Sequence, residues 1–248
     1  MASWRLLRPF SSRLFSLPMS PIRPSQPARA FTRTNITPSP TKTDTFVELA
    51  QARRTIYKLG NDSPVPDSKI EDLVHAAILN VPSAFNTQST RLLVLLHGEH
   101  ERLWDVVIQI FEGLVNSGAV PETTWRNQTL PKLLGIKGGV GTILFYEDPA
   151  HIQLFSKKFA LYKDHFEPWA GHSNAMHQYF LWTALESLGF GANLQHYNPL
   201  IDAPVAKQWD IPSDWKLVAQ LVFGSPEGSP NEKTQKPIAD RVKIYGKL

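Results

Sequence analysis

The stretch from His172 to Asn198 constrains the fold most, because it predicts a long helix that is apolar around nearly its whole circumference. The apolar positions are Met176, Phe180, Thr183, Ala184 and Leu188 at helical spacing, with Leu181, Trp182 and Leu185 between them. A helix of this kind must be covered on every side by protein. The sequence therefore predicts a central, buried helix.

The ends of this helix are suggested by residues that favour helix caps. Ser173 can accept hydrogen bonds from the first free backbone N–H groups, and Gly189 suits a left-handed stop. The following segment, Gly191 to Tyr197, is expected to be extended and polar at its end. Its side chains suit a ligand as well as a core, so both interpretations stay open.

An arginine-rich segment precedes the domain. Residues 1–43 hold 7 of the 26 Lys and Arg, many serines, and no acidic residue before Asp44. This composition is typical of a mitochondrial transit peptide, and residues 29–32 resemble a matrix-peptidase cleavage site. A disordered tail rich in Pro and Ser is the alternative. We expect import into the matrix, a cytosolic form begun at Met19, and a single domain over residues 44–248.

The basic character of the chain belongs mostly to this leader. Without its 7 Lys and Arg, 19 of the 26 remain against 22 acidic residues, so the formal charge changes from +4 to −3. We therefore expect no nucleic-acid partner. No apolar run reaches the ~20 residues that would cross a bilayer.

Several chemistries lack their motifs. The chain has no cysteine, which excludes disulfides and cysteine-ligated metals. His172 and His177 are five residues apart, whereas a helical zinc pair needs four, so no metal site is expected. The serine-hydrolase and phosphate-loop motifs are also absent. Hydrolytic chemistry therefore has no support.

Hydrophobic spacing predicts four strands among about five helices, which is an α+β or α/β arrangement. A capping box at residues 68–71 should open the second helix, and residues 168–171 should form a loop. The glycines between 135 and 141 lack dinucleotide-binding spacing, so we interpret them as turn and close-approach positions. The expected helices cover residues 44–50, 68–81, 99–116, 149–162 and 172–188, and the expected strands cover residues 92–96, 142–146, 191–197 and 215–224.

Polar residues recur at the ends of these elements. The candidates are Arg53, Arg54 and Thr55 early, Asn86 and Gln88 next, Gln195 and His196 after the central helix, and Lys233 and Lys236 late. Cations suit a phosphate, and amides suit the pyrimidine edge of a ring system. This pattern permits FMN without demanding it, since paired arginines could equally be a solvated helix end.

Three segments in this order, Ala52–Tyr57, Pro82–Gln88 and His172–Asn198, resemble the nitroreductase family. The resemblance is closest to its fungal and bacterial subgroup linked to fatty-acid signalling. It implies an α+β fold with an antiparallel-rich sheet flanked by helices. It also implies an obligate homodimer with two FMN sites at its interface and a C-terminal arm embracing the partner.

The resemblance assigns expected roles to residues of this chain. Arg53, Arg54 and Thr55 would hold the FMN phosphate and ribityl chain, and Lys236, with Lys233, would complete the phosphate site. Asn86 would meet the flavin pyrimidine, with Ser83 and Gln88 beside it. Gln195 and His196 would approach flavin N5. No side chain is expected to act as a catalytic acid or base, because the flavin carries the chemistry. Residues 88–90 and 195–196 depart from the common family pattern, which predicts a differently shaped pocket over the ring.

The function implied by this resemblance is an FMN-dependent NAD(P)H oxidoreductase. It would reduce nitro compounds or quinones by ping-pong hydride transfer. Reductive dehalogenation and flavin cleavage are alternatives within flavoproteins. A further alternative is a flavin-binding regulatory protein in lipid signalling or stress response with little turnover.

Overall fold

The computed structural model describes residues 40–247. The expected transit peptide therefore lies almost wholly outside the described residues. The elements are α1 (Lys42–Ala52), β1 (Leu59–Gly60), α2 (Asp67–Asn80), η1 (Ala84–Asn86), β2 (Thr90–Leu96), α3 (Gly98–Asn116), α4 (Glu122–Thr124), η2 (Trp125–Thr129), α5 (Leu130–Lys137), β3 (Gly141–Glu147), α6 (Pro149–Lys158), η3 (Ala160–His165), α7 (Phe166–Ser187), β4 (Gly191–Gln195), α8 (Asp202–Gln208) and β5 (Lys216–Pro226).

The strands form one five-stranded sheet in which each named pair is antiparallel. Its path is β1-β5-β3-β2, and β4 also pairs with β5. Strand β3 is buried at every position, as expected for a central strand. The four predicted strands are all present. The fifth, β1, has only two residues, which is too short to leave a periodic pattern in the sequence.

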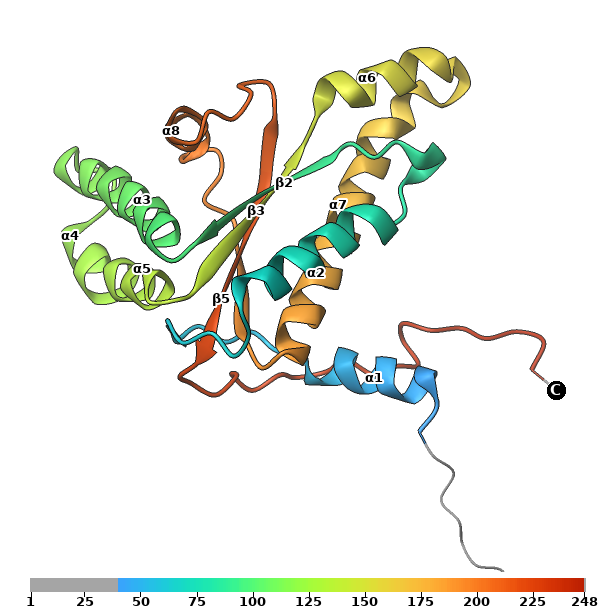
Figure 1. Ribbon diagram of the computed structural model, residues 1–248, viewed down its shortest axis with the longest axis horizontal. Helices are drawn as coiled ribbons and strands as arrows, with labels where there is room; N and C mark the ends of the chain where they lie inside the picture. Colours follow the sequence, from blue (N-terminus) through green and yellow to red (C-terminus); the bar gives the residue numbers. More distant parts are fainter. Residues whose placement is uncertain (1–39, 248) are drawn as a thin grey trace, which may run out of the picture. The chain divides into compact units, whose positions relative to one another are not determined.

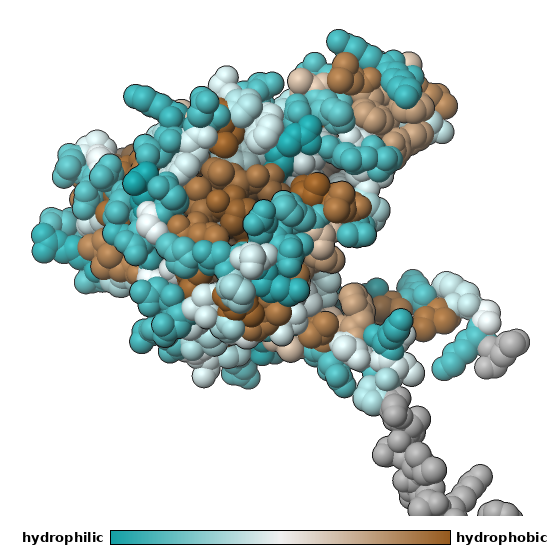
Figure 2. Space-filling model, in the orientation of Figure 1, coloured by the Kyte–Doolittle hydropathy of each residue, from teal (hydrophilic) through white to brown (hydrophobic). Residues whose placement is uncertain are grey.

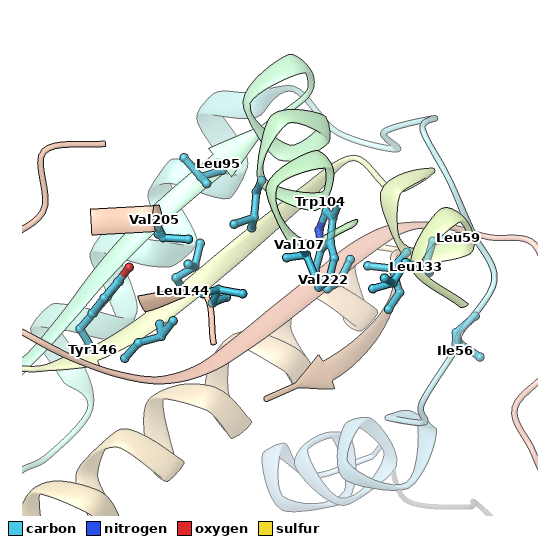
Figure 3. Close-up of a cluster of buried hydrophobic side chains, with 14 of the residues drawn as sticks. Ile56, Leu59, Leu95, Trp104, Val107, Leu133, Leu144, Tyr146, Val205 and Val222 are labelled. Atoms are coloured by element: carbon cyan, nitrogen blue, oxygen red, sulfur yellow. The ribbon is translucent and has the colours of Figure 1, made fainter. Parts of the chain in front are cut away.

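Helices cover both faces of this sheet (Figure 1). Alternate residues of β3 face opposite cores, because successive side chains of a strand point to opposite sides. Leu144 packs in a cluster with residues of α3, α5 and α8 (Figure 3). Ile143 and Phe145 belong to a second cluster with residues of α2 and α7. The layered α+β fold with an antiparallel sheet is confirmed.

Helix α7 is longer than expected. It begins at Phe166, so the loop predicted for residues 168–171 is wrong. Proline is tolerated there because Pro168 lies in the first turn, where its missing N–H breaks no helical hydrogen bond. Ser173 is therefore not a cap. It is buried within the helix, and its hydroxyl donates to the Pro82 carbonyl at 3.0 Å. The stop at Gly189 is confirmed by a φ of +95°.

Two other helix predictions are corrected by the structure. Helix α2 begins at Asp67 after Pro66, without a side-chain cap, so the box at residues 68–71 is wrong. The capping box is instead at α1, between Thr41 and Asp44, which starts the domain slightly before residue 44. The helix expected over residues 149–162 divides into α6 and η3.

The segment from residue 119 to 141 is more regular than its sequence indicates. It contains α4, a π-helix and α5, and Gly135 lies within α5 instead of in a turn. The close-approach role is confirmed at Gly139, where a Cβ would lie 2.8 Å from the Phe223 carbonyl oxygen. These glycines let the chain pass close to β5.

Within residues 40–247, no helix is both long and apolar enough to cross a membrane. The same residues contain no group of three or more His, Asp or Glu side chains placed to hold a metal ion.

Candidate functional site

The first expected site segment follows the end of α1. At Arg53 the backbone leaves the helical conformation (φ −60°, ψ 113°) and becomes extended. Thr55 then forms a parallel bridge with Ala192 of β4, and the Ile56 N–H donates to the Ala192 carbonyl at 3.0 Å. The sheet therefore fixes the backbone of residues 53–56.

A cavity of about 250 Å³ opens beside this segment. We call it the cation cradle; it is lined by Arg53, Arg54, Thr55, Tyr57, Asn231, Glu232 and Lys233. It lies between the end of α1 and residues 231–233 of the C-terminal tail, which are distant from α1 in the sequence. Lys236 lies further along the exposed tail and does not line the cradle.

Helix α7 holds the two arginines in place. The Arg53 guanidinium lies 4.4 Å from the centroid of the Trp182 ring. The Arg54 backbone N–H donates to Glu186 Oε2 at 2.7 Å, and Trp182 Nε1 donates to Glu186 Oε1 at 3.0 Å. The Arg54 guanidinium donates to the Asn231 carbonyl. Both arginines are half-buried, so the solvated helix end is not what the structure contains.

Two carboxylates lie near this arrangement: Glu232 lines the cradle, and Glu186 holds the arginines from α7. Burial raises the pKa of Glu186, whereas the hydrogen bonds from Arg54 and Trp182 act in the opposite direction. It binds a backbone N–H and an indole N–H, with no guanidinium among its hydrogen-bond partners in the described chain. Within the described residues, Glu186 therefore leaves both guanidinium groups free of a carboxylate hydrogen bond, although that of Arg54 already donates to Asn231.

The second expected segment is the polar loop Pro82–Gln88. Phe85, Asn86 and Gln88 have φ values of 52°, 55° and 52°, which non-glycine residues seldom adopt. The Gln88 N–H donates to Ser83 Oγ at 2.9 Å, which closes the loop on itself. Strain of this kind is often found at functional sites. The Asn86 side chain is exposed.

Phe85 anchors the loop in an aromatic cluster. Its ring centroid lies 4.7 to 5.8 Å from four other rings, which are those of Phe159, Tyr162, Phe166 and Trp169. Even so, Phe85 is 47 % exposed. Figure 2 shows hydrophobic side chains gathered on the projecting end of the molecule that carries α6. The cluster therefore both supports the loop and presents apolar surface.

The third expected segment lies at the end of β4. The Gln195 side chain is buried and donates to Asn193 Oδ1 at 2.7 Å, and Asn193 donates to the Ile56 carbonyl at 2.8 Å. This side chain is thus engaged inside the protein. His196, the next residue, is exposed. Of this pair, only His196 has a side chain that is exposed at the surface.

A buried carboxylate, missed in the sequence, ties the loop to the rest of the fold. Glu147 is 5 % exposed and accepts hydrogen bonds from Ser89 Oγ (2.5 Å), Thr90 Oγ1 (2.7 Å) and Asn174 Nδ2 (2.8 Å). Residues 89 and 90 belong to one of the two segments that depart from the family pattern. A Glu at the end of an otherwise apolar strand was the available signal.

The expected site residues do not meet in one cavity of the single chain. Ser83 and Gln88 line a separate cavity of about 120 Å³, together with His177. It shares no lining residue with the cation cradle in the described part of the chain. Burial lowers the pKa of His177, so its imidazole is neutral at pH 7.

Helix α7 also leaves one face uncovered. A groove of about 610 Å³ runs along it, lined on opposite sides by residues such as Phe46 of α1, Pro82, and Met176 of α7. Met176 and Tyr179 are each 42 % exposed, and Phe46 is 61 % exposed. The expectation that α7 is covered on every side is therefore wrong for one chain taken alone.

Residues 50–225 match the sequence model of the Nitroreductase family. The chain belongs to the nitroreductase family. This nitroreductase is 32 % identical over 194 residues to nitroreductase FRM2 of Saccharomyces cerevisiae, a match that spans 77 % of this chain and 93 % of that protein. Membership of the family supports an oxidoreductase function.

Solved structures of other proteins have the same fold. Nitroreductase CinD from Lactococcus lactis, in complex with chloramphenicol, is 40 % identical with a TM-score of 0.72, over 80 % of this chain and 98 % of that one. A Desulfovibrio desulfuricans protein solved in complex with FMN is 16 % identical with a TM-score of 0.57, over 82 % and 97 %. At that identity the second likeness concerns the fold alone.

Proposed function

We propose that this nitroreductase binds FMN and uses NADH or NADPH to reduce nitro compounds or quinones. The observation that carries the proposal is the cation cradle, in which Arg53, Arg54, Thr55 and Lys233 line one cavity. When bound, FMN would supply the redox chemistry, which is hydride transfer from the nicotinamide and electron transfer to the acceptor.

The cradle fits the phosphate of FMN. Its lining includes three cationic side chains and the Thr55 hydroxyl against the single carboxylate of Glu232, and guanidinium groups bind phosphate through short, charge-assisted hydrogen bonds. Trp182 and Glu186 fix the two arginines before a ligand arrives, so less side-chain freedom is lost on binding. Lys236 is exposed and lies outside the lining of the cradle, so its role in the proposed site is a supporting one only.

The chain's own residues bind and orient the cofactor, and none needs to act as an acid or base. The loop Pro82–Gln88 offers the Asn86 amide at its exposed tip, which suits the donor and acceptor pattern of a pyrimidine edge. The neutral His177 adds no charge beside Ser83 and Gln88. Relatives support the acceptor class, because CinD has been solved with the nitroaromatic compounds chloramphenicol and 4-nitrophenol.

A homodimer would unite the two halves of the site. The cation cradle of one chain and the Pro82–Gln88 loop of its partner would then share one cofactor. The uncovered face of α7 supports this assembly, as does the tail, where Ile238, Ile244 and Tyr245 are each more than 70 % exposed. Burying such apolar surface is the main driving force of association.

The test is the visible spectrum and the turnover of the purified chain. We expect a yellow protein that oxidises NADH or NADPH in the presence of 4-nitrophenol or menadione. A colourless protein that cannot be reconstituted with FMN would contradict the proposal. A yellow protein that oxidises neither nicotinamide with any acceptor would favour the regulatory alternative, a flavin-binding protein with little turnover.

Import into mitochondria is also proposed, on the composition of residues 1–43. The negative formal charge of the remaining chain agrees with a leader that is functionally separate from the domain.

A further inference from the structure

A cavity of about 420 Å³ lies between β3 and α8, and residues of both elements pack in the core cluster on the sheet face opposite α7. The lining residues that matter here are Tyr146, Asp202, Ala206, Ile211 and Trp215. Among the described residues, none that lines this cavity also lines the cation cradle or the small cavity beside Ser83, Gln88 and His177. We call it the α8 cavity.

Two buried polar atoms that line this cavity have no partner within residues 40–247. One is the hydroxyl oxygen of Tyr146, a residue that is only 3 % exposed. The other is Oδ1 of Asp202. Figure 3 shows the Tyr146 side chain with its hydroxyl end directed toward the helix that carries Val205, which is α8. Buried groups of this kind are costly, and native proteins nearly always pair them.

The protonation states of Tyr146 and Asp202 determine which hydrogen bonds a ligand must accept and donate. Burial, and then the nearby charge of Asp202, raise the pKa of Tyr146, so its hydroxyl stays protonated at neutral pH. Burial also raises the pKa of Asp202. In its ionised form this carboxylate can only accept hydrogen bonds, whereas a phenol can also donate. Because Tyr146 does not donate to Asp202, a ligand would have to accept from Tyr146 and donate to Asp202.

The other lining residues determine what kind of ring the ligand can carry. Ala206, Ile211 and the Trp215 indole supply an apolar wall that suits a flat hydrophobic ring. Lys207 and Ser213 also line the cavity. One bridging water could pair both polar atoms, but it would fill only about 30 Å³ of the space. The cavity is instead in the range of small-molecule sites, which are roughly 300 to 1,000 Å³, mostly apolar, with a few placed polar groups.

We propose that the α8 cavity is a second small-molecule site that binds a planar aromatic carboxamide. The carboxamide oxygen accepts from the Tyr146 hydroxyl, its N–H donates to Asp202, and the ring lies against Ala206 and Trp215. This site is independent of the flavin and of the proposed reaction.

Benzamide is the probe for this site, titrated by calorimetry into the purified full-length chain with its flavin. We expect one benzamide per chain, with the visible flavin spectrum unchanged. Tyr146→Phe keeps the ring and removes the hydroxyl, so affinity should fall about 5- to 10-fold, as for the loss of one hydrogen bond. Ala206→Leu fills the cavity and should abolish binding.

Two controls make the result specific. Tyr162→Phe removes a hydroxyl from the aromatic cluster, outside the α8 cavity, and should leave benzamide affinity unchanged. Benzoate should bind more weakly than benzamide, because it has no N–H to donate to Asp202. The proposal is overturned if benzamide does not bind, which would leave ordered water in the cavity, or if Tyr146→Phe and Ala206→Leu bind it as the wild type does. Loss of flavin or of turnover is measured separately and leaves this result intact.

Discussion

Arg53 and Arg54 are neighbours in the chain, yet the structure uses them differently. Arg54 is held at both ends, through its backbone by Glu186 and through its guanidinium by the Asn231 carbonyl. Within residues 40–247, the Arg53 guanidinium is held only by the face of Trp182, which satisfies none of its five N–H donors. Arg53 is thus the better placed of the two to give its hydrogen bonds to a phosphate.

Replacing Arg53 by alanine tests this assignment. The change removes a charge-assisted hydrogen bond worth roughly 1.5 to 3 kcal/mol, so FMN affinity should fall about 10- to 150-fold. Riboflavin lacks the phosphate, and its affinity should change far less. Fluorescence titration with both flavins measures the two affinities.

The matched variant is Asn86→Ala, at the ring end of the expected site. It should weaken FMN and riboflavin alike, since both carry the same ring. An equal loss of both flavins in Arg53→Ala would show that Arg53 is structural and that the phosphate lies elsewhere.

His100 predicts a pH dependence of stability. It is fully buried, Thr142 Oγ1 lies 2.8 Å from its Nδ1, and its Nε2 lies 3.2 Å from the Lys137 carbonyl. Burial lowers its pKa from 6.5 to about 4. Between these values the unfolded chain binds a proton that the folded chain does not, so the free energy of unfolding should fall by up to roughly 3 kcal/mol as pH drops from 6.5 to 4.

Urea unfolding over this pH range measures the effect. His177, whose pKa is also lowered, contributes in the same direction. His100→Gln should flatten the pH dependence, whereas His75→Gln, at an exposed position, should leave it unchanged. An unchanged slope in His100→Gln would refute the assignment.

At the scale of elements, the sequence predicted the sheet better than the helix ends. Strands β2, β3 and β5 are apolar runs in a buried sheet, which periodicity detects readily. The start of α7 was missed because Pro168 usually marks a loop, although a first helical turn also accepts it. The end of α2 at Asn80, near Pro82, was predicted because proline disfavours helix in the residue before it.

The sequence was enough to name most of the candidate site residues, but not to predict which of them the fold brings together. The resemblance identified Arg53, Arg54, Thr55 and Lys233, which do line one cavity. It also singled out Gln195, whose side chain the fold uses to support Asn193. The position of Glu147 at the end of an apolar strand marks it in the sequence, but its role cannot be predicted there. Its three partners come from β2, its preceding loop and α7, and only the folded chain brings them together.

The uncovered face of α7 leads to a prediction about assembly. Met176→Lys would place a charge in the groove, and burying an unpaired charge is costly, so the variant should be monomeric. Its FMN affinity should fall as well, because the site would lose the partner's loop. Leu134→Lys adds the same charge at an exposed position of α5, 52 % exposed, and serves as the control. Light scattering that shows a dimer for Met176→Lys would exclude this face as the interface.

At the scale of the whole molecule, the two ends of the chain have separate expected roles. Residues 1–43 are predicted to direct import, so a fluorescent protein fused behind them should reach the mitochondrial matrix. The same fusion begun at Met19 loses three of the seven cationic residues, Arg5, Arg8 and Arg13, and should be imported poorly. Microscopy with a matrix marker measures both. A cytosolic signal from the full leader would reject the prediction.

The C-terminal tail is predicted to act both as an arm and as part of the phosphate site. Residues 227–247 contain no regular helix or strand, and Tyr245 is 85 % exposed. The Glu227 N–H still donates to the Lys58 carbonyl, so removing residues 228–248 should leave the sheet intact. We expect this truncation to lose both the dimer, seen by light scattering, and tight FMN binding, seen by fluorescence.

A second variant separates the two roles of the tail. Lys233→Ala combined with Lys236→Ala keeps the apolar side chains of the arm, so it should remain a dimer while its FMN affinity falls through the loss of cationic contacts to the phosphate. Riboflavin affinity should be nearly unchanged in this variant, but it should fall in the truncated chain, where the partner's loop is also lost. A truncated chain that is still an FMN-bound dimer would show that neither role belongs to the tail.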